Sequence, residues 1–331
     1  MRYRIDTQRR GGGTVHRLFD DQTGASASVL PDYGFNLFDL RLPAAGAVRP
    51  VLDAASDWAD RPREPGRHGN PILFPFPNRI ANARYSFDGK EYRLPANNGP
   101  NAIHGFAIAA KWDVMEHAAR DDGATIIGRY QISKQSPEAL ELWPTDAVLE
   151  VRFTLAGRKL TMDTTVSNPT ARDLPYGFGI HPYFRLPLAP GGDPTRTRIT
   201  IPAGEFWGLK DFLPTGERRP VQARLDFRKG QPIAGLKLDD VLTGLTPNDG
   251  SGYVCRLEDL ALGAEFRLGF DSSFREIVVY TPPGPGGVIA IEPYTQTTDA
   301  INLQARGVDA GLRVLKHGQQ DMLRITMETV G

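Results

Sequence analysis

Apolar and polar residues alternate in short runs along much of this chain, and turn-forming residues separate successive runs. In the stretch RYSFDGKEYRL (84–94), apolar side chains occupy every second position on both sides of Asp88-Gly89. A period of two places these side chains on one face of a strand, and Asp-Gly favours a type I′ turn. The stretch therefore predicts a β-hairpin.

The same pattern recurs in longer stretches. Alternating runs occur at residues 111–132 with a turn at Asp122-Gly123, at 149–168 with a turn at Gly157, at 264–270 and at 322–330. Helix signals are scarce. SPEALELW (136–143) has Ser136 as a candidate N-cap before Pro137, which predicts one or two helical turns.

Many hairpins and few helices indicate an all-β protein whose sheets pack against each other. We expect a large antiparallel β-sandwich, either one sandwich or two merged into one unit. No internal repeat or low-complexity linker divides the 331 residues. Because large β folds often remain single at this length, we expect one domain over residues 1–331.

Composition narrows the possible partners. The 39 basic and 39 acidic side chains cancel, and no basic block suggests a nucleic-acid tract or a membrane patch. The N-terminal stretch lacks the apolar segment of a signal peptide, and no run of about 18 apolar residues occurs. The single cysteine, Cys255, excludes an intramolecular disulfide. We therefore expect a cytoplasmic monomer or homodimer without nucleic-acid or membrane partners.

Candidate chemistry begins with a carboxylate in an apolar run. In GVIAIEPYTQTTDAIN (287–302), the isoleucines face one side of a predicted strand, and Glu292 ends the strand in line with Val288. Pro293 follows and restricts Glu292 to extended geometry. Such a glutamate is either an acid that reaches the surface at the strand end or a fixed functional carboxylate.

His181 has a similar setting, since it follows the apolar stretch YGFGI and precedes Pro182. Two side chains on stiff, extended backbone at the ends of apolar runs suit a preorganised acid–base pair. Taken alone, a structural histidine hydrogen-bonded beneath Tyr183 and Phe184 is the simpler interpretation.

Three more candidates lie in stretches rich in glycine, proline or aromatic residues. His104 lies in NNGPNAIHGF, and Arg79 lies in GNPILFPFPNRIAN, where its guanidinium suits either a structural ion pair or two sugar hydroxyls. In LKLDDVLTG, alternation turns one of Asp239 and Asp240 inward and the other outward. An exposed loop acid is the alternative for either.

Metal and phosphate chemistry have no visible signature. The sequence has no HxH, HExxH or close His/Cys cluster, no phosphate-binding glycine loop before a helix, and no GxSxG motif. We therefore expect no metal and no cofactor. Dispersed His, Glu, Asp and Arg with aromatic residues are typical of a sugar site.

Five of these stretches, in this order, resemble the aldose 1-epimerase (galactose mutarotase-like) family. The similar elements are Asn78-Arg79-Ile80, Ile103-His104-Gly105, His181-Pro182-Tyr183-Phe184, Leu238-Asp239, and Glu292 with Asp299-Ala300 and Asn302. The resemblance implies that family's large β-sandwich, a supersandwich. It also implies an isomerase that interconverts the α and β anomers of a free hexose without a cofactor.

The resemblance also implies a role for each candidate residue. Glu292 matches the family's catalytic base and His181 its catalytic acid, while His104, Arg79 and Asp239 match residues that hold the sugar's hydroxyls and ring oxygen. We expect an ionised Glu292 that raises the pKa of a protonated His181, and hence a bell-shaped pH profile with the acid limb set by the glutamate.

The chain departs from the family pattern around these residues. Phe106 replaces a second glycine after His-Gly, and Ile180 replaces a threonine or asparagine before His-Pro. Arg185 replaces an asparagine after Tyr-Phe, and Pro293 replaces a polar residue after the glutamate. His181 and Glu292 themselves remain, so the departures bear on the substrate more than on the reaction type.

Several functions stay open. The substrate is either a neutral aldose, which we favour because no second arginine is tied to the site by motif, or a hexose 6-phosphate that Arg185 would meet. Asp239 and Glu292 could instead form the carboxylate pair of a glycoside hydrolase. A protein that binds carbohydrate without turnover is the third alternative, although binding alone needs no acid–base pair.

Overall fold

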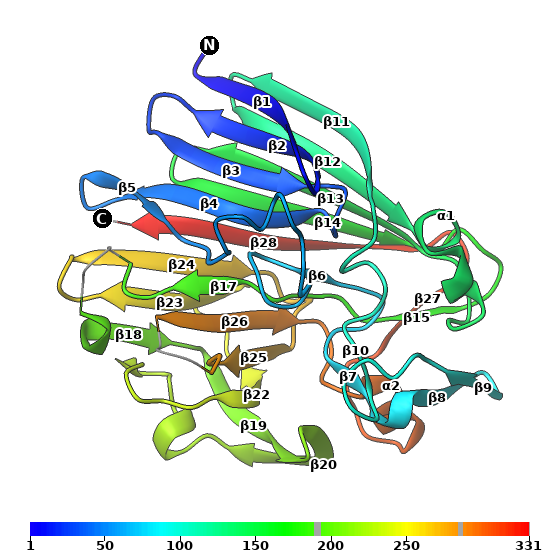
Figure 1. The fold of residues 1–331 in the computed structure, drawn as a ribbon. Coiled ribbons are helices and arrows are strands. Elements are labelled where there is room, and N and C mark those ends of the chain that lie inside the picture. Colours follow the sequence, from blue (N-terminus) through cyan, green and yellow to red (C-terminus); the bar gives the residue numbers. More distant parts are fainter. Residues whose placement is uncertain (189–192, 284–286, 331) are drawn as a thin grey trace.

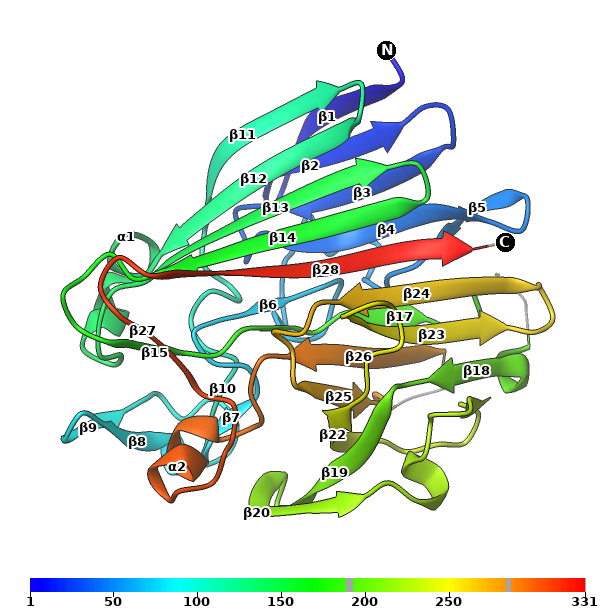
Figure 2. The same cartoon turned by 180° about the vertical axis from the view of Figure 1, so that it is seen from behind.

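Antiparallel strands dominate the computed structural model, which describes residues 1–188, 193–283 and 287–330. A nine-stranded sheet runs through the molecule from top to bottom (Figures 1 and 2). Its strands, in spatial order, are β11 (Asp113–Arg120), β12 (Gly123–Gln131), β13 (Val148–Ala156), β14 (Lys159–Ser167), β28 (Gln320–Val330), β24 (Ala264–Phe270), β23 (Tyr253–Asp259), β18 (Thr197–Thr200) and β21 (Gln231–Pro232).

Two further sheets pack against this one. The five-stranded sheet has the order β1 (Tyr3–Arg10), β2 (Gly13–Asp20), β3 (Ala25–Leu30), β4 (Asn36–Ala44) and β5 (Ala47–Pro50). The eight-stranded sheet has the order β20 (Leu213–Pro220), β19 (Ala203–Lys210), β22 (Asp239–Leu245), β25 (Glu276–Tyr280), β26 (Val288–Tyr294), β16 (Gly179–Ile180) and β6 (Ile72–Leu73), and β17 (Tyr183–Arg185) also pairs with β26.

Short elements complete the fold. Three two-stranded pairs are β7 (Arg79–Ile80) with β10 (Ala102–Ile103), β8 (Arg84–Phe87) with β9 (Lys90–Arg93), and β15 (Leu174–Tyr176) with β27 (Arg313–Leu315). The α-helices are α1 (Ile132–Gln135) and α2 (Ala300–Ala305), and the 3₁₀ turns span Ala81–Ala83, Pro137–Leu140, Pro194–Arg196 and Ala223–Leu225. None of the helices in the described segments is long and apolar enough to cross a membrane.

The alternating pattern predicted this all-β architecture correctly. In the hairpin of β8 and β9, Phe87 pairs with Lys90, and both turn residues, Asp88 and Gly89, have positive φ, as a type I′ turn requires. The next predicted turn is one residue off, because Gly123 already pairs with Arg120 and Asp121-Asp122 form the turn.

The one or two helical turns predicted within 136–143 form as the 3₁₀ turn Pro137–Leu140, with Pro137 at its start. The predicted cap is wrong, because the side chain of Ser136 makes no capping hydrogen bond. The short helix α1 ends just before it. These turns connect β12 and β13.

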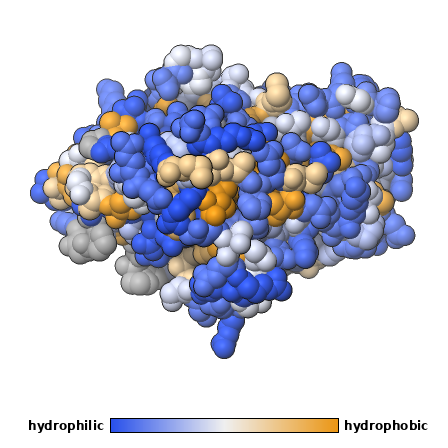
Figure 3. All heavy atoms as spheres, turned by 90° about the horizontal axis from the view of Figure 1, so that it is seen from above, coloured by the Kyte–Doolittle hydropathy of each residue, from blue (hydrophilic) through white to orange (hydrophobic). Residues whose placement is uncertain are grey.

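The core lies between the layers. One cluster of buried side chains contains Leu40 of β4, Phe153 of β13, Phe266 of β24 and Ile289 of β26, so residues of all three sheets share it. Viewed from above, the surface is mostly hydrophilic with small apolar areas between (Figure 3). The alternation seen in the sequence thus corresponds to strands with one buried and one solvated face.

Candidate active site

His181 and Glu292 lie opposite each other in the eight-stranded sheet. β16 pairs with β26 at Gly179 and Tyr294, and β17 resumes the pairing at Tyr183. Continuing this antiparallel register across the gap places His181 directly across from Glu292, where side chains of one face meet. The contact therefore follows from the pairing of strands far apart in the sequence.

The prediction that Glu292 ends its strand is wrong, because β26 continues through Pro293 to Tyr294. The carbonyl oxygen of Tyr294 accepts the N–H of Arg275 on the β25 side. Backbone groups of successive residues point to opposite edges, so Pro293 faces the β16 side. On that side the hydrogen-bond ladder is interrupted between β16 and β17. The missing N–H group of Pro293 therefore costs the sheet no hydrogen bond.

The pair is in contact and almost fully buried. Nε2 of His181 lies 3.3 Å from Oε1 of Glu292, and the two side chains are 8% and 1% exposed. The hydroxyl of Tyr294 donates a hydrogen bond to Oε2 of Glu292. Tyr183 stacks on the imidazole with ring centres 4.6 Å apart, and its hydroxyl donates to the carbonyl oxygen of Gly66 at 2.5 Å. Both side chains of the pair are therefore fixed by protein contacts.

Burial controls the protonation of this pair. It raises the pKa of Glu292 well above its ordinary value, against the smaller opposing effect of the Tyr294 hydrogen bond. It lowers the pKa of His181 to about 3. The expected rise of the histidine pKa is therefore wrong, because desolvation of the imidazolium is the largest effect on His181 and the same burial disfavours an ionised Glu292 beside it. Both shifts act in the same direction: burial favours the neutral pair, with the proton on Glu292, over the ion pair.

His104 reaches the pocket from the turn after β10. Its φ is 68°, and at Gly105, with a φ of 70°, an added Cβ would lie 2.2 Å from the carbonyl oxygen of Phe74. The N–H of Asn78 donates to Nδ1 of His104 at 3.3 Å, which places the proton of the neutral ring on Nε2. Burial lowers the pKa of His104 well below its ordinary value. Its Nε2–H is thus a neutral hydrogen-bond donor.

Among the described residues, amide oxygens hold Arg79 and no carboxylate does. Its Nε donates to Oδ1 of Asn98 at 2.8 Å, and a terminal nitrogen donates to Oδ1 of Asn78 at 3.1 Å. The guanidinium lies over the ring of Phe212, 5.0 Å from its centre. The structural ion pair considered from the sequence is therefore not what positions Arg79, and its charge remains available to a ligand.

Asp239 and Asp240 point to opposite sides, as alternation predicts. Asp239 begins β22 opposite Tyr280 and lines the pocket, where burial raises its pKa and the charge of Arg79 opposes that rise. Asp240 accepts hydrogen bonds from both terminal nitrogens of Arg224 at 2.7 and 2.9 Å. Asp239 is therefore the inward member.

One pocket of about 190 Å³ brings all five predicted site residues together. Its described lining consists of Gly66, Asn78, Arg79, Ile103, His104, His181, Tyr183, Asp239, Val278, Tyr280 and Glu292. Neutral and charged donors, a carboxylate acceptor and aromatic rings thus surround the buried pair, which is the composition expected for a small polar ligand with apolar faces.

Sequence reasoning missed Tyr280, Tyr294, Gly66 and Arg67. Tyr280 presents its ring to the edge of His181 with centres 6.3 Å apart, and the guanidinium of Arg67 lies 5.0 Å from the ring centre of Tyr183. Tyr280 ends the apolar run EIVVY, a signal that could have been used. Gly66 and Arg67 lie in a turn-rich segment without periodicity, which carried no signal.

The Asp299-Ala300-x-Asn302 element forms hydrogen bonds with the backbone next to the site. Oδ1 of Asp299 accepts the N–H of Ala81 at 3.0 Å and Nδ2 of Asn302 at 2.7 Å. The N–H of Asp299 donates to the carbonyl oxygen of Arg79 at 2.8 Å. These residues fix the backbone that carries Arg79 and do not line the pocket described above.

The departures from the family pattern lie outside this pocket. Phe106 packs edge-on against Phe76 and Trp143, with ring centres 6.1 and 6.2 Å apart, and Ile180 is fully buried in the core. Arg185 donates to the carbonyl oxygen of Leu52 at 3.0 Å and forms an ion pair with Asp53 at 3.2 Å. Arg185 is therefore already engaged, away from the pair.

Fold and pocket together define an all-β sandwich protein with a histidine–carboxylate pair at the base of a small polar pocket. The chain belongs to the aldose 1-epimerase family, whose model matches residues 18–327. The family resemblance noted in the sequence, and the fold that it implied, are thereby confirmed.

Individual relatives match this chain at modest sequence identity. The galactose mutarotase of Sus scrofa is 33% identical over 156 residues, which cover 46% of this chain and only 43% of that protein. The uncharacterized protein YphB of Escherichia coli (strain K12) is 29% identical over 258 residues, which cover 70% of this chain and 82% of that protein. A galactose mutarotase-like protein from Clostridium acetobutylicum has a TM-score of 0.87 at 22% identity, over 99% of this chain and 98% of that one.

Proposed function

We propose that the protein interconverts the α and β anomers of a free, neutral aldose such as a hexose. The observation that carries the proposal is the separation of 3.3 Å between Nε2 of His181 and Oε1 of Glu292 at the base of the pocket. Two groups at this spacing can each exchange a proton with one of two oxygens bonded to the same carbon. In a cyclic aldose the anomeric carbon carries such a pair, the hydroxyl oxygen and the ring oxygen.

Ring opening requires a base at the anomeric hydroxyl and an acid at the ring oxygen. When the shared proton is on His181, Glu292 is ionised and accepts the hydroxyl proton while His181 protonates the ring oxygen. The bond from C1 to the ring oxygen breaks, and the C1–O1 bond becomes a carbonyl. Rotation about C1–C2 exposes the other face of the aldehyde, and the reverse transfers close the ring. Protons and electrons balance without a cofactor.

The surrounding residues would bind and orient the sugar. Nε2–H of His104 and the guanidinium of Arg79 are donors for hydroxyl oxygens, and Asp239 is an acceptor. The asparagines bound to Arg79 limit the movement of its fork, which reduces the entropy lost on binding. Holding the anomeric centre in one orientation is what lets a fixed acid and base act on it.

A neutral substrate fits the charges better than a phosphorylated one. Arg79 is the one arginine or lysine among the lining residues of this pocket that the structure describes. Arg185, the residue that a 6-phosphate would meet, already pairs with Asp53. A phosphate of about two negative charges would need more cationic partners than these.

Polarimetry of freshly dissolved α-glucose and α-galactose, with and without protein, tests the proposal. We expect the protein to accelerate the approach to the anomeric equilibrium. Sugar binding without acceleration would establish a carbohydrate-binding protein instead, and release of reducing sugar from glycosides would establish a hydrolase. A catalytic efficiency for hexose 6-phosphates ten times that for any neutral aldose would overturn the choice of substrate.

A further inference from the structure

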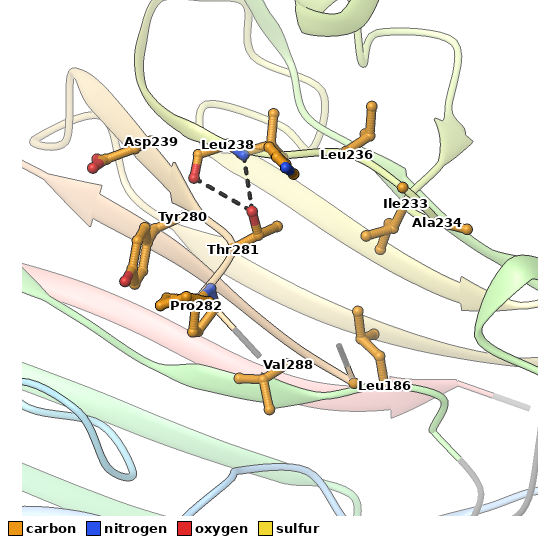
Figure 4. Close-up of a pocket in the computed structure, with 14 residues that line it drawn as sticks. Leu186, Ile233, Ala234, Leu236, Leu238, Asp239, Tyr280, Thr281, Pro282 and Val288 are labelled. Atoms are coloured by element: carbon orange, nitrogen blue, oxygen red, sulfur yellow. Dashed lines mark hydrogen bonds between the residues drawn. The ribbon is translucent and has the colours of Figure 1, made fainter. Parts of the chain in front are cut away.

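A second pocket of about 840 Å³ adjoins the candidate active site. Asp239 and Tyr280 line both pockets. Figure 4 shows these two side chains at one end of the second pocket, with Leu186 and Ile233 at the other end. A ligand in the smaller pocket therefore has a neighbouring space that begins at Asp239 and Tyr280.

Aliphatic side chains form most of the walls of this second pocket. Leu186, Ile233 and Leu238 are 9%, 6% and 3% exposed and form its inner surface. Partly or fully exposed residues form the rest of the apolar lining, namely Ala234, Leu236, Pro282, Pro283 and Val288. The space thus resembles the apolar part of a ligand site more than an extension of the polar pocket.

Few polar side chains are free to bind a ligand there. Besides the shared Asp239 and Tyr280, the described lining includes Lys237 and Thr281. The hydroxyl of Thr281 accepts the N–H of Leu238 at 2.8 Å, one of the dashed contacts in Figure 4. Lys237 is exposed at the rim. A second sugar ring would need several convergent donors and acceptors, whereas an alkyl or aryl group needs none.

We propose that this second pocket binds an apolar substituent carried by the aldose on a hydroxyl remote from the anomeric carbon. The inference rests on the proposed function, which places the anomeric oxygens at His181 and Glu292 and other hydroxyls of the ring toward Asp239, which lines both pockets. A substituent that leaves the ring on that side enters the second pocket. The preferred substrate is then an aldose bearing an alkyl, acyl or aryl group, which is turned over more efficiently than an unsubstituted monosaccharide.

Rates of mutarotation for glucose and for its 4-O-hexyl and 6-O-hexyl ethers test this inference. These ethers are stable in water, and their anomeric hydroxyl is free. We expect kcat/KM for one of the ethers to exceed that for glucose by about tenfold or more, since each methylene buried in an apolar pocket contributes substantially to discrimination. Equal or lower efficiency for both ethers would overturn the inference and leave the proposed function intact. Higher efficiency for maltose or lactose than for either ether would assign the pocket to a second sugar.

Ala234→Trp gives the matching structural test. Ala234 is exposed at the pocket rim, so the indole can occupy the space without disturbing the core. We expect this variant to lose the preference for the ether while its rate with glucose stays within about threefold of wild type. Ala171→Trp is the control, because Ala171 is also exposed and lines neither pocket. An unchanged preference in Ala234→Trp would contradict the inference.

Calorimetric binding of the same compounds keeps the inference testable if no aldose is turned over. In that case the proposed function fails, while tighter binding of a hexyl ether than of glucose, abolished by Ala234→Trp, would still assign the second pocket to an apolar group. Equal binding of ether and glucose would reject it.

Discussion

Replacing Tyr294 by phenylalanine removes one hydrogen bond from the carboxylate of Glu292 and leaves an aromatic ring in place. Tyr294 and Glu292 are 0% and 1% exposed, so water cannot readily replace the lost donor. A hydrogen bond to a charged group contributes roughly 1.5–3 kcal/mol, and about 1.4 kcal/mol corresponds to one pKa unit. The ionised form of Glu292 should therefore become less favourable by about one to two pKa units.

The effect on rate follows from where the shared proton of the pair resides. Burial places it on Glu292, so the reactive form, with ionised Glu292 and protonated His181, is a minor species. Tyr294→Phe should lower its population, and with it kcat/KM, by about 10- to 100-fold. The acid limb of the kcat/KM profile, where neutral His181 gains a proton beside a neutral carboxyl, should stay in place. The alkaline limb, where Glu292 loses its proton, should move up by about one to two pH units.

Polarimetric rates across the pH range, corrected for spontaneous mutarotation, check both limbs. Tyr92→Phe is the matched control, because the hydroxyl of Tyr92 is buried without a hydrogen-bond partner in the described part of the chain and lies outside the pocket. Movement of the acid limb with a fixed alkaline limb would show that the proton resides on His181 and would refute the reasoning. A loss below about threefold with an unchanged profile would show that the Tyr294 bond does not tune Glu292.

Three other outcomes are expected. Glu292→Gln and His181→Asn should each lower turnover by roughly 10²- to 10⁴-fold, and the double variant should cost much less than the product of the two losses; retention of more than about a tenth of the rate by Glu292→Gln would exclude its role as base. Exhaustive chelation should leave the rate unchanged, and a loss that one added metal restores would contradict this. Arg185→Ala should not alter the preference for neutral aldoses over hexose 6-phosphates, and it should change the free energy of unfolding by less than about 1 kcal/mol, because its ion pair with Asp53 is partly exposed.

Several strands that alternate strictly could be predicted from the sequence, whereas β3, which does not alternate, was missed. The run at 264–270 coincides with β24, and the run at 322–330 lies within β28. β3 (ASASVL) is buried at every position, so it lacks the alternation that marks a strand with one solvated face. β3 was therefore not predicted, because burial on both faces depends on tertiary packing.

The candidate residues could be predicted from the sequence, but the contact between His181 and Glu292 and the order of their pKa values could not. Proline after His181 and after Glu292 marked both as residues on extended backbone. Their contact depends on the register between β26 and the β16–β17 segment, which joins residues more than 100 positions apart. The inverted order of their pKa values likewise depends on burial, which local sequence does not report. The second pocket has no motif, because it forms between the ends of several strands.

Burial of the acid–base pair fits the proposed reaction better than two exposed groups would. After ring opening, Glu292 holds a proton and His181 is neutral, which is the same neutral pair that burial favours in the protein. Burial thus favours the protonation state that the pair has in the open-chain complex. The ionic state of the pair, with ionised Glu292 and protonated His181, must be supported by nearby groups. The Tyr294 hydrogen bond and the charge of Arg79 both favour ionised Glu292, so they offset part of the burial effect. A pair whose ionic state is disfavoured by burial but supported by these groups can transfer protons in either direction, which a reaction that opens and closes the ring on either face requires.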